Sequence, residues 1–160
     1  MKQGKVNYVT GDATRPQTDG PAIIVHVCND IGGWGKGFVM ALSRRWPEPE
    51  LHYRHWYADR DGNDFALGAV QLVQVENQLW VANLVGQQGV RRTKAGPPVR
   101  YDAIETGLAI VADNAAVLGA SVHMPRIGCG LAGGKWEQIE PILERTVIAS
   151  GIDTYVYDLP

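Results

Sequence analysis

The chain has 160 residues, of which 45% are hydrophobic and 20% are charged, a composition typical of a globular domain with one sizeable core. We therefore expect a single domain over residues 1–160. Its 15 Lys and Arg and 17 Asp and Glu give a net charge of −2, which excludes the strongly basic field that holds nucleic acid without sequence preference. The chain lacks a signal-peptide pattern and has no apolar run near the ~20 residues of a membrane span, so we expect a cytoplasmic protein with no membrane contact.

Strand and helix patterns alternate along the chain. In chain order they predict strands over 6–9 and 22–27, helices over 38–46 and 50–58, a hairpin of strands over 67–73 and 79–85, a loop over 86–98, a helix over 101–118, a strand over 121–125, a helix over 136–150 and a strand over 154–157. The run over 22–27 is apolar without a break, as in strands that are buried on both faces. Pro47 and Pro49 are expected to end the first helix, and Gly119 suits the C-cap of the third. We predict an α/β fold, a three-layer α/β/α sandwich with a mixed central sheet.

Two glycine-rich loops are the most informative feature of the sequence. The loop over 29–38 follows the strand over 22–27, and the loop over 126–134 follows the strand over 121–125. Each continues into a helical pattern and so presents free backbone amides at a helix start, where glycine permits close approach and the helix dipole favours negative charge. Ligands of open α/β sheets bind beyond the carboxyl ends of the strands. We therefore predict that both loops border one cleft and hold a diphosphate from two sides.

Several motifs in and around these loops resemble the macro domain family of ADP-ribose-binding modules. The run Met124-Pro125-Arg126-Ile127-Gly128-Cys129-Gly130-Leu131, followed by Trp136-Glu137, is the most specific of them. The run Gly33-Trp34-Gly35-Lys36-Gly37 with the later Arg44-Arg45-Trp46-Pro47 supports it. The resemblance covers nearly the whole chain, from Gly11-Asp12 to the last strand. It is greatest for the compact subgroup of terminal ADP-ribose protein glycohydrolase and ADP-ribose-1″-phosphate phosphatases, in its bacterial branch.

The resemblance implies a set of site residues. Asp12 would accept a hydrogen bond from the adenine amino group, which suits a carboxylate because it only accepts. Leu159, or alternatively Tyr157, would pack against the adenine. Asn29 and Asp30 would face the distal ribose and take part in catalysis. The other implied ligand contacts are Ala13, Gly33, Trp34, Gly35, Gly37, Phe38, Gly86, Gln87, Ile127, Gly128, Cys129, Gly130 and Leu131. The family resemblance implies neither a metal nor a cofactor.

The sequence departs from the human glycohydrolase of this subgroup at both of its catalytic side chains. That enzyme uses a lysine after a central strand and an aspartate in the second glycine loop, whereas the matching stretches here read Asn-Leu-Val-Gly-Gln-Gln over 83–88 and Gly-Leu-Ala over 130–132. We therefore expect a hydrolase that works without a lysine nucleophile and releases ADP-ribose from acidic side chains of modified proteins. Water held by the diphosphate and by loop groups would attack C1″ of the distal ribose.

Two alternative functions stay open at this point. One is an ADP-ribose-1″-phosphate phosphatase, in which His26 or Asp30 would take part. The other is a reader that binds ADP-ribose without catalysis. The expected partners are ADP-ribose and ADP-ribosylated proteins, with nucleic-acid-linked ADP-ribose as an alternative. Arg44-Arg45 and Arg91-Arg92 are expected to be solvated, or alternatively to contact an acidic protein or a nucleic-acid carrier of ADP-ribose.

The histidines and cysteines, which could in principle take part in catalysis or bind a metal, have simpler interpretations. His26 lies within an apolar strand and is expected to be a hydrogen-bonded core residue, with proton transfer as the alternative. His52 and His55 share a predicted helix but have no evident third ligand for a metal. Cys28 and Cys129 are expected to be buried, inert thiols.

Overall fold

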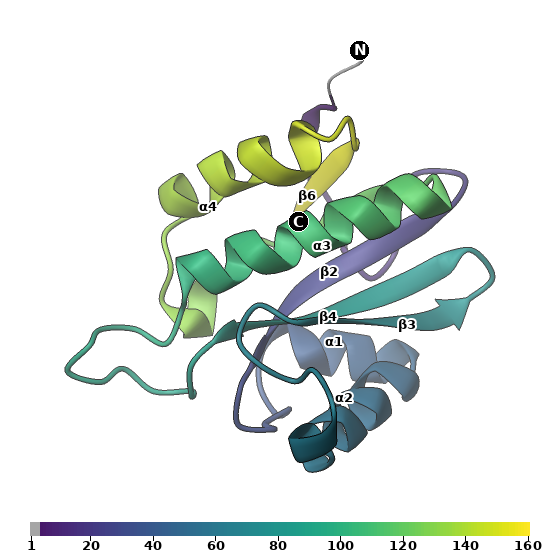
Figure 1. Ribbon diagram of the computed structural model, residues 1–160. Helices are drawn as coiled ribbons and strands as arrows, with labels where there is room; N and C mark the ends of the chain where they lie inside the picture. The colour runs from purple at the N-terminus through teal and green to yellow at the C-terminus, as the bar shows by residue number, and fades with distance from the viewer. Residues whose placement is uncertain (1–3) are drawn as a thin grey trace.

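Helices cover both faces of one six-stranded sheet in the computed structural model, which describes residues 4–160 (Figure 1). The strands are β1 (Val6–Thr10), β2 (Ala22–Asn29), β3 (Val70–Glu76), β4 (Leu79–Gln87), β5 (Ser121–Met124) and β6 (Thr154–Asp158). The helices are α1 (Phe38–Arg45), α2 (Glu48–Ala58), α3 (Tyr101–Leu118) and α4 (Trp136–Leu143). Two 3₁₀ turns, η1 (Arg60–Gly62) and η2 (Gly130–Ala132), and one π-helical turn, η3 (Glu144–Ile148), complete the elements.

The strands lie in the order β1-β6-β5-β2-β4-β3, and only the β3–β4 pair is antiparallel. Helices α3 and α4 cover one face of the sheet and α1 and α2 cover the other (Figure 1). This arrangement confirms the predicted three-layer sandwich with a mixed sheet. Because β1, β6, β5, β2 and β4 are parallel, the segments that follow them all begin at the same edge of the sheet.

Strand β2 is buried on both faces, as its apolar run predicts. Its side chains alternate between two apolar clusters: Ile23 and Val25 pack under α3 and α4, whereas Ile24 and Cys28 pack under α1 and α2. Full burial of an aliphatic side chain of this size contributes roughly 1.5–3 kcal/mol to stability. The strand that leads into the first glycine loop is therefore one of the most firmly held elements of the fold.

The structure moves several predicted boundaries in the first half of the chain: β1, β2, β3 and β4 end one to three residues later than predicted and α1 ends one residue earlier. Two changed starts have a clear physical reason. Pro49 lies in the first turn of α2, where its missing N–H costs no helical hydrogen bond, so α2 begins at Glu48. Strand β3 begins at Val70 and not at residue 67. The reason is a turn in which Gly68 has a φ of 92° and the Ala69 amide donates to the Ala66 carbonyl.

The second half of the chain follows the predictions more closely. Gly119 has a left-handed φ of 65° and ends α3, which confirms the predicted C-cap. The helix predicted over 136–150 divides into α4 and η3, because the Ala149 amide donates to the Glu144 carbonyl five residues earlier. Among the helices of residues 4–160, none combines the length and the apolar character that crossing a membrane requires.

Candidate functional site

The two glycine-rich loops meet at the carboxyl edge of the sheet. Loop 1 (residues 30–37) joins β2 to α1, and loop 2 (residues 125–135) joins β5 to α4. Because β2 and β5 are adjacent and parallel, their carboxyl ends are neighbours. A cleft of about 280 Å³ is lined by residues of both loops. The structure thus brings the two loops together around one cleft.

More than half of the predicted ligand contacts line this cleft. They are Gly37, Phe38, Gln87, Ile127, Gly128, Cys129, Gly130 and Leu131. The cleft is also lined by residues that the sequence analysis left out of the ligand contacts, notably His26 of β2, Lys36 of loop 1 and Arg126 of loop 2. Lys36 and Arg126 lie inside the glycine motifs, and this position could have identified them as cleft residues from the sequence.

Glycine is required at two points where the loops are closely packed. Gly37 has φ 81° and ψ −145°, a conformation that only glycine adopts readily, and a β-carbon there would lie 3.4 Å from Cδ1 of Leu131 in loop 2. Gly128 has φ 74°, and its β-carbon would lie 2.9 Å from Cδ1 of Ile104 in α3. The backbone conformation therefore requires glycine at the first point, and the close packing of loop 2 on α3 also requires it at the second.

Free backbone amides and positive charge characterise the lining of the cleft. Within residues 4–160 the Gly128 and Gly130 amides donate no hydrogen bond, and amides at the start of α1 have no helical acceptor. Lys36 adds a cation, whereas the guanidinium of Arg126 is ion-paired with Asp158, with Nε 2.7 Å from Oδ1 and Nη2 2.9 Å from Oδ2. No Asp or Glu is among the described residues that line the cleft. A concave site with this lining favours an anionic, phosphate-bearing ligand.

Asn29, a predicted catalytic residue, is engaged in shaping loop 1. Its Oδ1 accepts hydrogen bonds from the amides of Ile31 at 3.0 Å and Gly33 at 2.9 Å, and from the Tyr53 hydroxyl at 2.9 Å. Its Nδ2 donates to the Gly33 carbonyl at 3.0 Å. The side chain is buried and is not among the residues that line the cleft.

Asp30, the second predicted catalytic residue, connects loop 1 to the segment after β4. Its Oδ1 accepts a hydrogen bond from the Gly89 amide at 2.8 Å. Asp30 is also outside the set that lines the cleft. Both residues therefore hold the loops in position in this structure, and their direct part in catalysis stays a prediction.

Four further predicted contacts lie near the cleft without lining it. Trp34 is buried in the cluster under α1 and α2, and its Nε1 donates to Ser43 at 2.8 Å. Gly86 is buried beside Ile104 of α3. Gly33 and Gly35 are in loop 1 between Asn29 and the cleft-lining end of that loop. The ligand contacts predicted for these four residues stay predictions.

The predicted adenine contacts lie further along the same edge of the sheet. Leu159 directly follows β6, and Asp12 is separated from the end of β1 by Gly11; β1 and β6 are adjacent parallel strands. Burial acts to raise the pKa of Asp12, but hydrogen bonds from the Thr14 amide and hydroxyl, each 2.8 Å, outweigh it and lower the pKa. The carboxylate is therefore charged and keeps acceptor capacity. Leu159 is 78% exposed, whereas Ala13 is buried.

The side chain of His26 is buried at the cleft in a fixed orientation. Its Nε2 lies 2.5 Å from Oδ1 of Asn83, its register partner in β4. Its Nδ1 has no hydrogen-bond partner within residues 4–160. Burial lowers the pKa of His26 from 6.5 to about 4, so the imidazole is neutral near pH 7. Cys28 is buried as predicted, whereas Cys129 is only partly buried because it lines the cleft. Burial nevertheless raises the pKa of the Cys129 thiol, which keeps it protonated.

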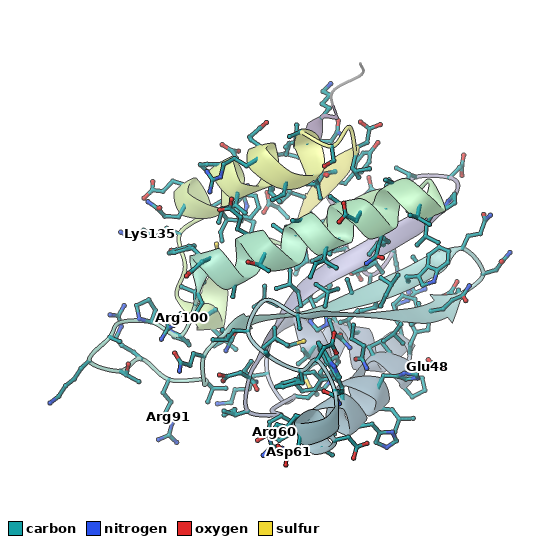
Figure 2. All side chains as sticks on the ribbon, viewed as in Figure 1. Glu48, Arg60, Asp61, Arg91, Arg100 and Lys135 are labelled. Carbon is teal, nitrogen blue, oxygen red and sulfur yellow. The ribbon has the colours of Figure 1, made fainter. Side chains whose placement is uncertain are left out.

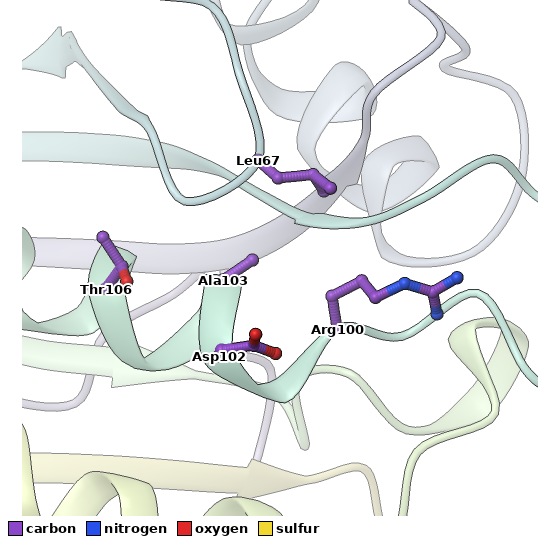
Figure 3. A pocket seen from close by; sticks show the side chains of 5 residues that line it. All are labelled: Leu67, Arg100, Asp102, Ala103 and Thr106. Carbon is purple, nitrogen blue, oxygen red and sulfur yellow. The ribbon is translucent and has the colours of Figure 1, made fainter.

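A second cavity lies at the start of α3, outside the glycine loops. It measures about 230 Å³ and is lined by Leu67, Arg100, Asp102, Ala103 and Thr106 (Figure 3). The Arg100 guanidinium donates to the carbonyls of Pro97 and Val99, both at 2.8 Å, and so stabilises the backbone of the preceding loop. No predicted site residue lines this second cavity.

Figure 2 shows Arg91 on the loop after β4, pointing away from the body of the protein.

The described residues offer no evident metal site. Within residues 4–160 no three His, Cys, Asp or Glu side chains gather closely enough to hold a metal ion. His52 and His55, which share α2, are included in that finding.

Comparisons with known proteins agree with this fold. A scan against models of protein families finds no match. The solved structure of a macrodomain protein from Streptomyces coelicolor is 57% identical in sequence, with a TM-score of 0.86, over 96% of this chain and 99% of that one. A Bacteroides thetaiotaomicron protein of unknown function is 54% identical, with a TM-score of 0.94, over 98% of this chain and 99% of that one.

Two named proteins are more distant relatives. Chromodomain-helicase-DNA-binding protein 1-like from Danio rerio is 35% identical over 161 residues, which are 95% of this chain but only 15% of that protein. The ADP-ribose 1″-phosphate phosphatase of Meyerozyma guilliermondii is 23% identical over 174 residues, 95% of this chain and 98% of that enzyme. The Streptomyces macrodomain shares more than half of its residues with this chain over nearly the full length of both, and the chain therefore belongs to the macrodomain family.

Proposed function

We propose that this macrodomain binds ADP-ribose in the cleft between loops 1 and 2 and hydrolyses the ester between ADP-ribose and acidic side chains of modified proteins. One observation carries the proposal: the loops that follow two adjacent parallel strands, β2 and β5, present backbone amides to a single cleft. A diphosphate is anionic and only accepts hydrogen bonds at neutral pH, so it needs donors on both sides. The free amides of loop 2, the start of α1 and the cation Lys36 supply them.

The strand order gives room for the whole ligand. The carboxyl ends of β1, β6, β5 and β2 follow one another along the edge, and at about 4.8 Å per strand they span roughly 14 Å. In the proposed pose the adenine lies by Asp12 and Leu159, the diphosphate lies between the loops, and the distal ribose lies beyond β2 and β4. The ligand thus crosses the edge of the sheet from one end to the middle.

Hydrolysis in this cleft proceeds by direct attack of water. A water oxygen bonds to C1″ of the distal ribose, the bond from C1″ to the ester oxygen breaks, and the side chain leaves as a carboxylate while the proton passes to solvent. A carboxylate is a stable leaving group, so strong acid catalysis is unnecessary. No lysine nucleophile is needed, because the loop amides orient the ligand and stabilise charge.

A second candidate function is release of phosphate from ADP-ribose 1″-phosphate. The fungal phosphatase, which aligns with this chain over nearly all of both sequences, favours it. Of the two participants considered for that reaction, His26 lines the cleft and Asp30 does not. The same cleft serves both reactions, because the two substrates differ only in the group on C1″.

The proposal is tested by combining calorimetry with a single-turnover assay. Calorimetry measures ADP-ribose affinity, and the assay follows ADP-ribose release from a protein modified on glutamate and, in parallel, phosphate release from ADP-ribose 1″-phosphate. Binding with release from the modified protein supports the hydrolase. Binding with phosphate release alone supports the second candidate, and binding without either reaction indicates a reader. Failure to bind ADP-ribose contradicts all three.

A pair of glycine variants connects the activity to the cleft. Gly130 lines the cleft with φ 47° and nothing within 4 Å of an added β-carbon, whereas Gly119 ends α3 with φ 65° and equally open surroundings. Gly130→Ala and Gly119→Ala therefore impose similar backbone strain, of about 1–2 kcal/mol. Only Gly130→Ala should weaken ADP-ribose binding, by about tenfold or more, because its methyl group keeps the diphosphate from the amides. Equal effects of the two changes on affinity would place the ligand elsewhere.

A further inference from the structure

We infer that Nδ1 of His26 accepts a hydrogen bond from a hydroxyl of the distal ribose and so distinguishes ADP-ribose from ADP. The inference rests on the proposed function, because it assigns one residue to one end of the proposed ligand. It adds a specificity-determining residue to a site otherwise built from backbone amides and cations. His26 would be the side chain in the cleft that reads a hydrogen-bond donor on the ligand.

The hydrogen bonds of Asn83 determine which nitrogen of His26 carries the proton. Nδ2 of Asn83 donates to the Pro49 carbonyl and to Oε1 of Gln71, both at 3.1 Å. The amide is therefore oriented with Oδ1 toward His26, and an amide oxygen only accepts. Nε2 of His26 must carry the hydrogen, which leaves Nδ1 with a free lone pair.

The ring that carries this lone pair borders the cleft. His26 is 2% exposed and packs beside the aromatic rings of Trp34 and Phe38, with centroids at 5.3 and 6.1 Å. Nε2 faces Asn83 in β4, and Nδ1 is buried without a partner within residues 4–160. His26 and Phe38 line the cleft together with Gln87, the last residue of β4, so the ring lies where β2 and β4 meet the cleft.

A neutral acceptor selects one part of the ligand. A buried acceptor without a partner is unfavourable, so a donor at this point in the cleft gains a hydrogen bond that the protein itself does not satisfy. Phosphate oxygens at neutral pH offer no hydrogen, and the adenine amino group is assigned to Asp12 at the other end of the sheet edge. The distal ribose, next to β2 and β4, is the part of the ligand that brings hydroxyl donors to His26.

The wild-type protein provides a direct test by nitrogen-15 NMR of its histidine side chains. We expect His26 to be the Nε2–H tautomer at pH 7, with a bare Nδ1 whose signal shifts on saturation with ADP-ribose but not with ADP. An unshifted Nδ1 signal in a protein saturated with ADP-ribose overturns the inference and leaves the proposed function intact. Absence of ADP-ribose binding overturns both together.

Two variants provide a second readout. His26→Phe keeps a ring of similar shape without an acceptor, and His26→Gln keeps a donor for Asn83 and an acceptor for the ligand. We expect the ratio of ADP to ADP-ribose dissociation constants to fall about tenfold in His26→Phe and to be largely retained in His26→Gln, while ADP affinity stays near the wild-type value in both. A ratio that is unchanged in a folded His26→Phe protein contradicts the assignment. If that variant does not fold, the NMR result on the wild type decides.

Discussion

Replacement of Gly128 by alanine tests the claim that loop 2 must pack directly on α3. Gly128 has a left-handed φ of 74°, and an added β-carbon would lie 2.9 Å from Cδ1 of Ile104, 3.2 Å from Cδ1 of Ile139 and 3.4 Å from Cγ2 of Val99. All three neighbours are buried core residues with little room to move. Gly130, two residues later, has φ 47° and nothing within 4 Å of the same added atom.

A comparison of the alanine variants at these two glycines therefore separates the free-energy cost of backbone strain from that of steric crowding. A left-handed conformation costs a non-glycine residue about 1–2 kcal/mol, and this cost applies to both alanine variants. Overpacking of a dense core adds about 1–3 kcal/mol, and this cost applies to Gly128→Ala alone. Alanine also restricts the unfolded chain similarly in both variants, so this effect cancels in their difference. Gly128→Ala should thus be about 1–3 kcal/mol less stable than Gly130→Ala.

Urea denaturation of both variants, followed by circular dichroism, measures this difference in unfolding free energy. The m-values should match that of the wild type, so that the shift in midpoint reports stability. Calorimetry should show the reverse order for ligand affinity, with the greater loss in Gly130→Ala among the folded proteins. Equal stability of the two variants would refute the reasoning, because it would mean that loop 2 can move away from α3 at no cost.

Three further predictions concern the loop residues and the buried histidines. Asp30→Asn should retain most of the activity and Asp30→Ala should lose it, because the asparagine oxygen still accepts from the Gly89 amide. Asn29→Ala should lower the unfolding free energy by about 2 kcal/mol, because the Ile31 and Gly33 amides lose their acceptor and the Gly33 carbonyl loses a donor, whereas the Tyr53 hydroxyl keeps the main-chain carbonyl of Asn29, as measured by urea denaturation. Burial lowers the pKa of His26 and of His123 from 6.5 to about 4, so the unfolded chain takes up protons first and stability falls between pH 6.5 and 4. At pH 5 the loss is about 2 kcal/mol per histidine, measurable as a difference between urea midpoints at pH 7.5 and pH 5.

Each of these predictions has its own control. A catalytic carboxylate at position 30 would make Asp30→Asn as inactive as Asp30→Ala in the single-turnover assay. Asn29→Asp keeps the acceptor for the Ile31 and Gly33 amides but places a carboxylate oxygen against the Gly33 carbonyl, so it should recover only part of the stability that Asn29→Ala loses. His123→Gln should remove about half of the pH dependence between pH 6.5 and 5, and an unchanged pH dependence would show that His123 titrates normally in the folded protein.

Local patterns were sufficient to predict most of the fold. The unbroken apolar run of β2 indicates burial on both faces because the sheet is covered on both sides. The end of α3 at Gly119 follows from the left-handed conformation of that residue. The incorrect start of β3 has a tertiary cause, since the turn around Gly68 is held by its amide donating to Val85 of β4 at 2.8 Å. Hydrophobic periodicity along the sequence does not indicate that contact.

The site shows the same division between local and long-range information. Glycine spacing predicts two amide-rich loops because the freedom of glycine is a local property, and a loop after a parallel strand must lie at the carboxyl edge. The role of His26 depends instead on Asn83, 57 residues away, which only the β2–β4 register places against its Nε2. The hydrogen bond by which Asp30 connects loop 1 to the segment after β4 likewise depends on Gly89. The sequence by itself determined which segments form the cleft, and only the tertiary structure decided which atoms of those segments remain free for a ligand, because hydrogen-bond partners are chosen across the sheet and not along the chain.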